Sequence, residues 1–264
     1  MSREKMTAPK IANKKRLNEK IVCITAYDCP MGRIADAAGV DLILVGDSVG
    51  NVVLGYENTL PVTMEEMLHH TRAVRRGVKN ALLVADMPFM SYQASEDEAI
   101  RNAGLFIKAG AEAVKVEGGI SVAPLIKRLT DIGIPVMGHV GMTPQSINKF
   151  GGYRVQGRGT QSDIIAADAK AVQEARAFCV VLELIPAVVS ERITRELKIP
   201  TIGIGAGPDC DGEIQVINDL LGLSGETLKH TKCYVDAGDL FAKALETYSR
   251  EVRERQFPTE ENTF

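Results

Sequence analysis

The sequence predicts an α/β fold, a single (β/α)₈ (TIM) barrel, from three observations. Short runs rich in β-branched residues alternate with longer stretches of helical periodicity along most of the chain. These runs are hydrophobic almost throughout, as the strands of a parallel sheet covered by helices are. Eight of them fit within 264 residues, with no Ser/Pro-rich linker between them. A doubly wound open sheet is the alternative architecture.

The expected strands recur at fairly regular intervals, and the eighth is the least distinct. They are IVCITAY (21–27), LILVG (42–46), ALLVAD (81–86), AVKVE (113–117), PVMGH (135–139), CVVLE (179–183), TIGIG directly after Pro200, and QVIND (215–219). Helical stretches separate most of them, and we expect helices to begin after Thr63, Ser95 and Ser162, whose side chains are good N-caps.

Both ends of the chain are polar and are expected to lie outside the repeating strand and helix units. Residues 1–20 are rich in Lys and Arg but include Glu4 and Glu19, so they read as an N-terminal extension or a capping helix. Residues 254–264 read as a polar tail after a C-terminal helix. We therefore expect one domain over residues 1–264.

The overall composition favours a small-molecule ligand over a nucleic acid or a membrane. The formal net charge is −3 and the calculated pI is about 5.9, so no basic surface for nucleic acid or anionic lipid is expected. The five cysteines show no metal-binding spacing and read as reduced thiols. No secretory signal is recognisable, which makes the cytoplasm the expected location.

Two connections are longer than ordinary turns. They are DSVGNVVLGYENTLPVT (47–63), after the second strand, and VGMTPQSINKFGGYRVQGRGTQ (140–161), after the fifth. In a barrel, both would stand at the carboxyl ends of the strands, where active sites of this fold are built. They are candidate walls or lids of a site.

Five successive strands place ionisable residues at or just beyond their carboxyl ends. These residues are Asp47 (followed by Ser48), Asp86, the pair Lys115 and Glu117, His139, and Glu183. A polar residue at the end of one strand is ordinary, and Lys115 with Glu117 alone would also suit a water-facing strand or an internal ion pair. A parallel barrel, however, brings all of these strand ends to one rim, which predicts a single polar site.

Four acids at one rim require a cation, because burying unpaired carboxylates costs several kcal/mol. Oxygen ligands without cysteine favour a hard ion, Mg²⁺ or Mn²⁺, over zinc. Lys115 and Glu117 point to the same side of their strand, so Lys115 is expected to neutralise the carboxylate of a bound acid while Glu117 faces the metal.

Several motifs in order resemble the ketopantoate hydroxymethyltransferase family over most of the chain. They are ITAYD (24–28), LVGDSVG (44–50), TLPVTMEEM (59–67), LLVADMPFMSY (82–92), VKVEGG (114–119), GHVGMTPQS (138–146), FGGYRVQGR (150–158), VLELIP (181–186), IGIGAG (202–207) and DGEIQVINDLLGL (211–223). The resemblance implies a (β/α)₈ barrel, one Mg²⁺ per subunit and a homo-oligomer, commonly a decamer. It also implies transfer of a hydroxymethyl group from 5,10-methylenetetrahydrofolate to 3-methyl-2-oxobutanoate, giving ketopantoate for pantothenate and coenzyme A biosynthesis.

By the same resemblance, individual residues take roles. Asp47 and Asp86 would be metal ligands, with Glu117 beside the metal directly or through water. The 2-oxo acid would contact Asp47, Ser48, Asp86 and Lys115, and His139 would bind or support it. Glu183 would be the catalytic base. Two alternatives stay open, a Mg²⁺-dependent 2-oxo-acid lyase or mutase of the isocitrate lyase type, and a non-catalytic 2-oxo-acid-binding protein.

Overall fold

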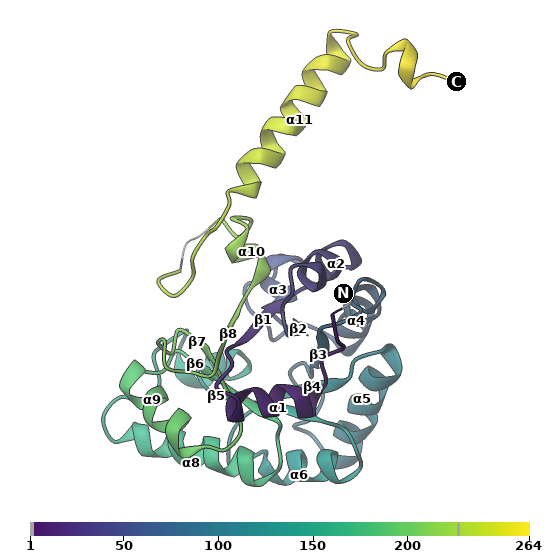
Figure 1. Ribbon diagram of the computed structural model, residues 1–264. Helices are drawn as coiled ribbons and strands as arrows, with labels where there is room; N and C mark the ends of the chain where they lie inside the picture. Colours follow the sequence, from purple (N-terminus) through teal and green to yellow (C-terminus); the bar gives the residue numbers. More distant parts are fainter. Residues whose placement is uncertain (1–2, 226–227) are drawn as a thin grey trace. The chain divides into compact units, whose positions relative to one another are not determined.

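In the computed structural model, eight parallel strands close into a barrel in chain order (Figure 1). They are β1 (Ile21–Thr25), β2 (Leu42–Val45), β3 (Leu82–Asp86), β4 (Ala113–Glu117), β5 (Val136–Gly141), β6 (Cys179–Glu183), β7 (Thr201–Ile204) and β8 (Gly212–Gln215). The barrel closes where β1 pairs with β8, with Ile21 opposite Gly212. The structure describes residues 3–225 and 228–264. The predicted (β/α)₈ barrel is confirmed.

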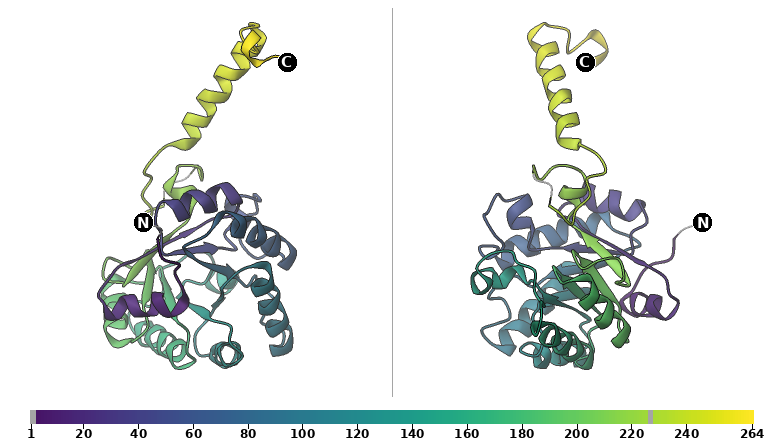
Figure 2. Two further views of the ribbon diagram at one scale, coloured as in Figure 1. Left: turned by 45° about the vertical axis from the view of Figure 1, so that its right-hand side comes forward. Right: turned by 90° about the vertical axis from the view of Figure 1, so that its left-hand side faces the viewer.

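Helices follow most strands and form the outer layer of the barrel (Figure 2). They are α2 (Cys29–Ala37), α4 (Met64–Gly77), α5 (Glu96–Ala109), α6 (Ala123–Asp131), α8 (Gln161–Glu174) and α9 (Ala187–Glu196). Two short helices, α3 (Val49–Val52) and α7 (Ile147–Phe150), lie within connections between strands and helices. The 3₁₀ helix η1 (Pro144–Ser146) precedes α7. Both long connections therefore contain short helices, α3 in the first and η1 with α7 in the second.

Two of the three predicted N-caps are confirmed. The Thr63 hydroxyl accepts a hydrogen bond from the backbone N–H of Glu66, and the Glu66 carboxylate accepts one from the backbone N–H of Thr63. The Ser95 hydroxyl accepts a hydrogen bond from the backbone N–H of Glu98. The prediction for Ser162 is wrong, because α8 begins at Gln161, two residues earlier than expected, and Ser162 lies inside its first turn. The preceding Thr160 holds the cap position without a side-chain hydrogen bond.

The predicted eighth strand is also wrong in position. β8 covers Gly212–Gln215, and Ile217 already begins the short helix α10 (Ile217–Leu220). A Cβ atom on Gly212 would lie 2.4 Å from the backbone oxygen of Ile21, so only glycine permits this close pairing with β1. The strand thus begins with a glycine followed by Glu213, which hides it from a search for β-branched runs.

The N-terminal extension forms the helix α1 (Ala8–Arg16), which covers the amino end of the barrel. Its Ile11 is fully buried and belongs to one core cluster with Ile21, Leu82 and Ile214 near the starts of three strands. Ion pairs at 3.0 Å (Lys14 to Asp41) and 2.7 Å (Lys15 to Asp211) fasten the helix there. Apolar burial and paired charges together close this end.

The same core cluster shows which side chains point into the barrel. It contains Leu82 and Val84 from β3, Ala113 from β4, Met137 from β5, and Cys179 and Val181 from β6. Because side chains alternate along a strand, the next inward positions toward the carboxyl ends are Asp86, Lys115, His139 and Glu183. The polar residues predicted to share one rim therefore continue the inward face of the apolar core.

The chain divides into two compact units, residues 1–216 and residues 217–264. The second unit contains α10, α11 (Ala237–Arg253) and the 3₁₀ helix η2 (Glu260–Asn262), which lies in the predicted polar tail. Along α11, the apolar side chains Leu240, Phe241, Leu245, Tyr248 and Val252 are exposed. The expectation of one domain over residues 1–264 stays a prediction. No helix of the described residues is long and apolar enough to span a membrane.

Candidate active site

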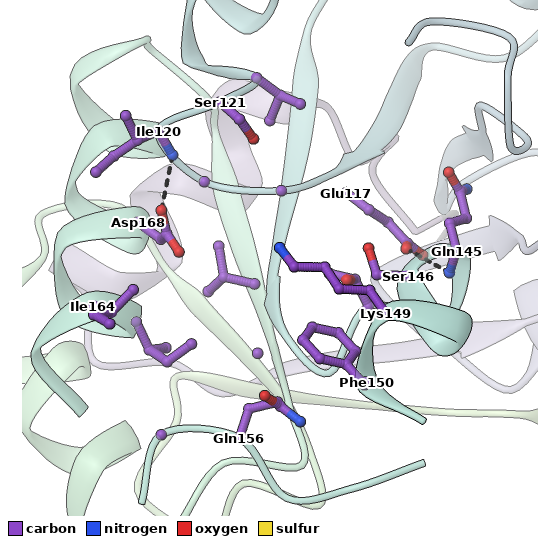
Figure 3. A pocket seen from close by; sticks show the side chains of 18 of the residues that line it. Glu117, Ile120, Ser121, Gln145, Ser146, Lys149, Phe150, Gln156, Ile164 and Asp168 are labelled. Carbon is purple, nitrogen blue, oxygen red and sulfur yellow. Dashed lines mark hydrogen bonds between the residues drawn. The ribbon is translucent and has the colours of Figure 1, made fainter. Parts of the chain in front are cut away.

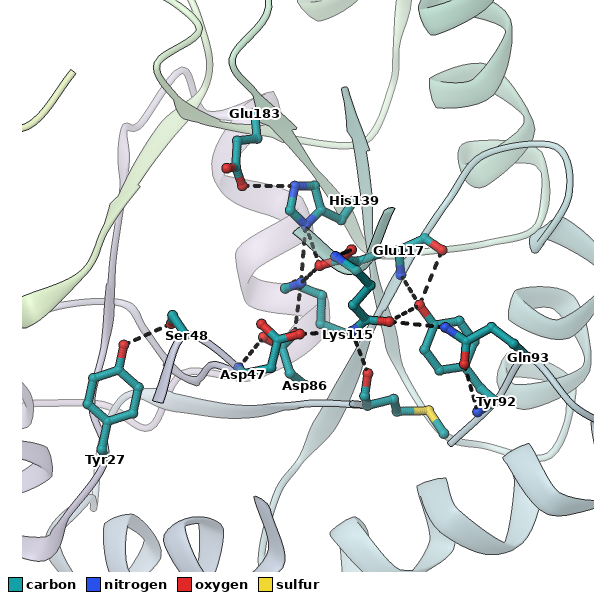
Figure 4. A network of polar contacts seen from close by, with 12 residues as sticks. Tyr27, Asp47, Ser48, Asp86, Tyr92, Gln93, Lys115, Glu117, His139 and Glu183 are labelled. Atoms are coloured by element: carbon teal, nitrogen blue, oxygen red, sulfur yellow. Dashed lines mark hydrogen bonds and ion pairs between the residues drawn. The ribbon is translucent and has the colours of Figure 1, made fainter. Parts of the chain in front are cut away.

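Six of the predicted polar residues form one network at the carboxyl ends of the strands, in which all but Glu183 are buried (Figure 4). The strand register aligns them: Asp86 on β3 lies beside Lys115 on β4, and Glu117 beside His139 on β5. Asp47, just beyond β2, donates its backbone N–H to Asp86 Oδ2 at 2.9 Å. Glu183 ends β6 and completes the network.

Lys115 lies at the centre of this network. Its Nζ is 2.8 Å from Asp86 Oδ1, 3.5 Å from Glu117 Oε1 and 3.1 Å from His139 Nδ1. Burial alone would lower the pKa of Lys115, but the carboxylates of Asp86, Glu117 and Asp47 raise it above its usual range. Lys115 is therefore a charged ammonium group held almost entirely away from water.

The neighbouring carboxylates outnumber this single cation. Asp47, Asp86 and Glu117 are each at most 7 % exposed. Burial, and then the charges of Asp86 and Glu117, raise the pKa of Asp47 well above its usual value. Burial likewise raises the pKa of Glu117. The site thus holds more buried carboxyl groups than Lys115 alone can keep in the charged form.

His139 connects Lys115 to Glu183 and is neutral, since burial and the Lys115 charge lower its pKa well below the usual value. An ammonium group can only donate, so His139 Nδ1 must accept from Lys115. The ring proton then lies on Nε2, which faces Glu183 Oε2 at 3.2 Å. The Glu183 side chain is 14 % exposed, against 3 % for Glu117, so it is the acid most open to a ligand.

Ser48 is near the same site but bonds in another direction. Its hydroxyl lies 2.8 Å from the hydroxyl of Tyr27, a residue that follows β1. A Cβ atom on the preceding Gly46 would come within 2.7 Å of Ser48 Oγ and 3.5 Å of Asp86 Oδ2. Glycine at position 46 therefore lets the backbone approach both side chains closely.

Two buried residues of the network, Gln145 and Tyr92, were not predicted. Gln145, in η1, donates its side-chain amide to Asp47 Oδ2 at 2.9 Å and its backbone N–H to Glu117 Oε2 at 3.0 Å. Tyr92 lies between Gln145 and the backbone of Glu117. Gln145 lies in the motif GHVGMTPQS and Tyr92 in LLVADMPFMSY, but neither residue is ionised at neutral pH or stands at the end of a strand, so the pattern of charged strand ends does not include them.

The donor set suits a magnesium ion. Within residues 3–225 and 228–264, no three His, Cys, Asp or Glu side chains converge as a ready-made metal cage. Mg²⁺ does not require one, because it usually binds one or two carboxylates and keeps several waters. Two adjacent buried aspartates, beside further acidic groups that disfavour their charged forms until a cation is present, meet that requirement.

A pocket of about 770 Å³ adjoins the network at Glu117 and Gln145 (Figure 3). Ser146, Lys149 and Phe150 line one side of it, and Ile120, Ile164 and Asp168 line another. Asp168 Oδ1 accepts a hydrogen bond from the Ile120 N–H at 2.9 Å, an approach for which Gly119 leaves room. The second long connection thus contributes both a network residue and a pocket wall.

Fold and site together define a class, (β/α)₈-barrel proteins with a buried acid and lysine cluster at the carboxyl ends of the strands. Among solved structures, phosphonopyruvate hydrolase in complex with oxalate and Mg²⁺ matches with a TM-score of 0.61 at 14 % identity, covering 97 % of this chain and 93 % of that one. A 2,3-dimethylmalate lyase of the PEP mutase/isocitrate lyase superfamily matches with a TM-score of 0.60 at 15 % identity, covering 97 % and 91 %. At such identities the likeness shows the fold alone.

Sequence comparison identifies the particular family. The profile described as ketopantoate hydroxymethyltransferase matches residues 5–260. A 3-methyl-2-oxobutanoate hydroxymethyltransferase of Trichlorobacter lovleyi is 55 % identical over 264 residues, covering 99 % of both chains. One from Syntrophus aciditrophicus is 53 % identical, covering 98 % of this chain and 97 % of that one. The chain belongs to the ketopantoate hydroxymethyltransferase family, an enzyme family, as the motifs predicted.

Proposed function

We propose that this enzyme transfers a hydroxymethyl group from 5,10-methylenetetrahydrofolate to 3-methyl-2-oxobutanoate, forming ketopantoate (2-dehydropantoate) for pantothenate biosynthesis. Family membership supports the reaction. The structural observation that supports this reaction at the barrel mouth is the surplus of buried carboxyl groups around Lys115. Such a surplus is costly without a ligand and suits a site for a cation and an anionic 2-oxo acid.

Asp47 and Asp86 would hold Mg²⁺, with Glu117 beside it directly or through water. When bound, the ion would supply Lewis-acid polarisation of the keto and carboxylate oxygens of the substrate. Manganese would suit the same oxygen donors. The pKa of Asp47, raised by burial and its acidic neighbours, supports this assignment because a nearby cation would offset the unfavourable charge.

Lys115 and Ser48 would orient the 2-oxo acid. The Lys115 ammonium group is kept charged and faces the acids at the mouth, so it can offset the substrate carboxylate. The Ser48 hydroxyl is half-buried and is fixed by Tyr27. His139 lies between Lys115 and Glu183 and would hold both side chains in place. Asp47 and Asp86 would contact the bound 2-oxo acid as well as the metal ion.

Glu183 would be the general base. Its carboxylate would take the proton from C3 of the oxo acid, and C3 would then form a bond to the methylene carbon of the folate. Water would supply the hydroxyl oxygen as both C–N bonds to that carbon break, and tetrahydrofolate would leave with the proton. Its partial exposure and its contact with the neutral His139 favour this role over that of the more buried Glu117. The adjoining pocket offers room for a second ligand beside Glu117, as the folate donor requires.

We also retain the expectation of a homo-oligomer that acts on small molecules and binds neither nucleic acid nor membrane. The exposed apolar side chains of α11 support association between copies, because exposed apolar surface is commonly covered in an assembly. Light scattering coupled to size-exclusion chromatography measures the number of subunits. A monomer at assay concentration would contradict this expectation.

A direct assay tests the proposed reaction. Enzyme treated with chelator is given both substrates, with or without Mg²⁺, and the product is analysed by mass spectrometry for addition of CH₂O to the oxo acid. We expect product only with a divalent metal. Binding of the oxo acid without product in Mg²⁺, Mn²⁺ or Co²⁺ would instead indicate a non-catalytic binding protein.

The role of Glu183 is tested separately by proton exchange. In deuterated water with Mg²⁺ and the oxo acid alone, wild-type enzyme should exchange the C3 proton. Glu183→Gln should slow the exchange by about 10²–10⁴-fold, the usual contribution of a general base, while the oxo acid still binds. Exchange at the wild-type rate in this variant would move the base role to another residue.

A further inference from the structure

Gln145 forms several hydrogen bonds within the proposed site, although the proposed function gives it no role. It lies in η1 and is 7 % exposed. Its side-chain nitrogen donates to Asp47 Oδ2 and to the backbone oxygen of Met87, both at 2.9 Å. Its side-chain oxygen accepts from the Tyr92 hydroxyl at 2.8 Å and from Gln93 Nε2 at 3.1 Å. Both hydrogens and both lone pairs of the amide are therefore used.

These partners permit only one orientation of the amide. The Asp47 carboxylate and the Met87 carbonyl can only accept, and they face the nitrogen. The Gln93 amide nitrogen donates to the opposite side. A reversed amide would place its oxygen against a carboxylate and a carbonyl, which is repulsive. The contacts thus fix both the position and the orientation of the side chain.

The backbone of the same residue restrains a second carboxylate. The Gln145 N–H donates to Glu117 Oε2 at 3.0 Å, which leaves Oε1 facing Lys115 and His139 at 3.5 and 3.6 Å. The Tyr92 hydroxyl, which supports the Gln145 oxygen, also accepts from the Glu117 N–H at 3.1 Å. Gln145, in the second long connection, is therefore hydrogen-bonded to two carboxylates, that of Asp47 just beyond β2 and that of Glu117 at the end of β4.

We propose that Gln145 is a positioning residue that aligns the carboxylates of Asp47 and Glu117 for the cation and the 2-oxo acid. This inference rests on the proposed function. By occupying Asp47 Oδ2, Gln145 leaves Oδ1 as the oxygen available to a cation. It acts through the carboxylates and contacts neither reacting carbon. Mutation of residues that orient metal ligands in this way typically costs about 10- to 100-fold in metal affinity or activity.

The test measures metal binding without turnover. Wild-type enzyme and Gln145→Met, which keeps the side-chain volume but removes both donors and the acceptor, are titrated with Mn²⁺ and followed by electron paramagnetic resonance. We expect Mn²⁺ affinity to fall by about 10- to 100-fold, with a changed spectrum of the bound ion. In the product assay with Mg²⁺, the kcat of Gln145→Met should also be lower than that of wild type, and saturating Mg²⁺ should restore kcat only in part.

The matched control is Gln173→Met in α8. The Gln173 side-chain oxygen accepts from the backbone N–H groups of Lys198 and Ile199, so this variant also loses glutamine hydrogen bonds that join distant segments. Neither partner belongs to the site. We expect its Mn²⁺ affinity and spectrum to match wild type, even where its melting temperature falls.

Two further variants keep the test decisive if Gln145→Met does not fold. Gln145→Asn keeps the amide but shortens its reach by one methylene, and Tyr92→Phe removes only the hydroxyl that supports the Gln145 oxygen. We expect weaker Mn²⁺ binding in both, with the smaller loss in Tyr92→Phe. Wild-type affinity and spectrum in every folded variant would overturn the role of Gln145. Absence of product from wild-type enzyme would instead overturn the proposed function.

Discussion

The two ends of the barrel use charged residues in opposite ways. At the amino end, Lys14 and Lys15 pair with Asp41 and Asp211, whose side chains are 9 % and 17 % exposed. Each of these carboxylates also accepts a backbone N–H, from Val22 and Thr201 respectively. At the mouth, the single cation Lys115 faces three acids, Asp47, Asp86 and Glu117. Charges are matched at one end and unbalanced at the other.

The pKa shifts of two aspartates express the same difference. Asp36, on α2, receives hydrogen bonds from the backbone N–H groups of Lys79, Asn80 and Ala81, just before β3. Burial would raise its pKa, but these hydrogen bonds lower it below the usual value. The pKa of Asp47 is raised instead. The charge of Asp36 therefore stabilises the fold, whereas the charge of Asp47 costs stability that a bound ligand can return.

Removal of the central cation should have the largest effect. Lys115→Met leaves Asp86 and Glu117 buried without a counter-ion, which should lower the free energy of unfolding by about 3–5 kcal/mol. Loss of a preorganised positive charge should also lower kcat/KM by about 10²–10³-fold. Urea unfolding monitored by circular dichroism and the ketopantoate assay measure the two effects.

Lys15→Met at the amino end is the matched control for this variant. It also breaks a Lys–Asp pair, but in a half-buried position where Asp211 keeps hydrogen bonds from Thr201. We expect a loss of about 1 kcal/mol or less and unchanged kcat/KM. Equal loss of stability at both ends would show that the mouth charges are ordinary structural pairs.

Much of this contrast could be predicted from the sequence, because it depends on local patterns. The positions of Asp86, Lys115, His139 and Glu183 at the carboxyl ends of the third to sixth strands were enough to predict that they share one rim, and the structure brings them together. Their chemical roles stay predictions. β8 was misplaced since its glycine and glutamate do not follow the strand pattern.

Gln145 shows where local patterns stop being informative. Its partners Glu117 and Asp47 lie 28 and 98 residues away in the chain. Nothing in the residues adjacent to Gln145 specifies these contacts, which exist only once the barrel has closed. An amide is also a common surface residue, so its burial between two carboxylates carries no signal in one sequence.

Asp47→Asn is expected to raise the free energy of unfolding, by a smaller amount than Lys115→Met lowers it. Without metal, this variant removes one surplus charge while an amide oxygen can still accept from Gln145, so we expect the free energy of unfolding to rise by about 1–2 kcal/mol. Mg²⁺ at 100 times its Kd should stabilise wild type by about 2.7 kcal/mol and the variant much less. Calorimetry with chelator or Mg²⁺ measures both differences. A metal-free variant less stable than wild type would contradict the assignment of surplus charge.

The smallest expected effect is that of Asp36→Asn, and its pH dependence has a definite sign. Since the pKa of Asp36 is lower in the folded protein than in the unfolded chain, its charge stabilises the fold above the unfolded value of 3.8, and the stabilisation is lost as pH falls through the folded value. At pH 7 the variant should be about 1 kcal/mol less stable than wild type, because the neutral amide offers one accepting oxygen where the carboxylate offers two, so at least one of the three backbone N–H groups loses its acceptor. Urea unfolding of both proteins from pH 7 down to pH 3 should show this difference shrinking below about pH 4. A difference that stays constant over that range would mean that Asp36 contributes by shape alone, and that the amino end does not draw stability from its charges as the comparison with the mouth requires.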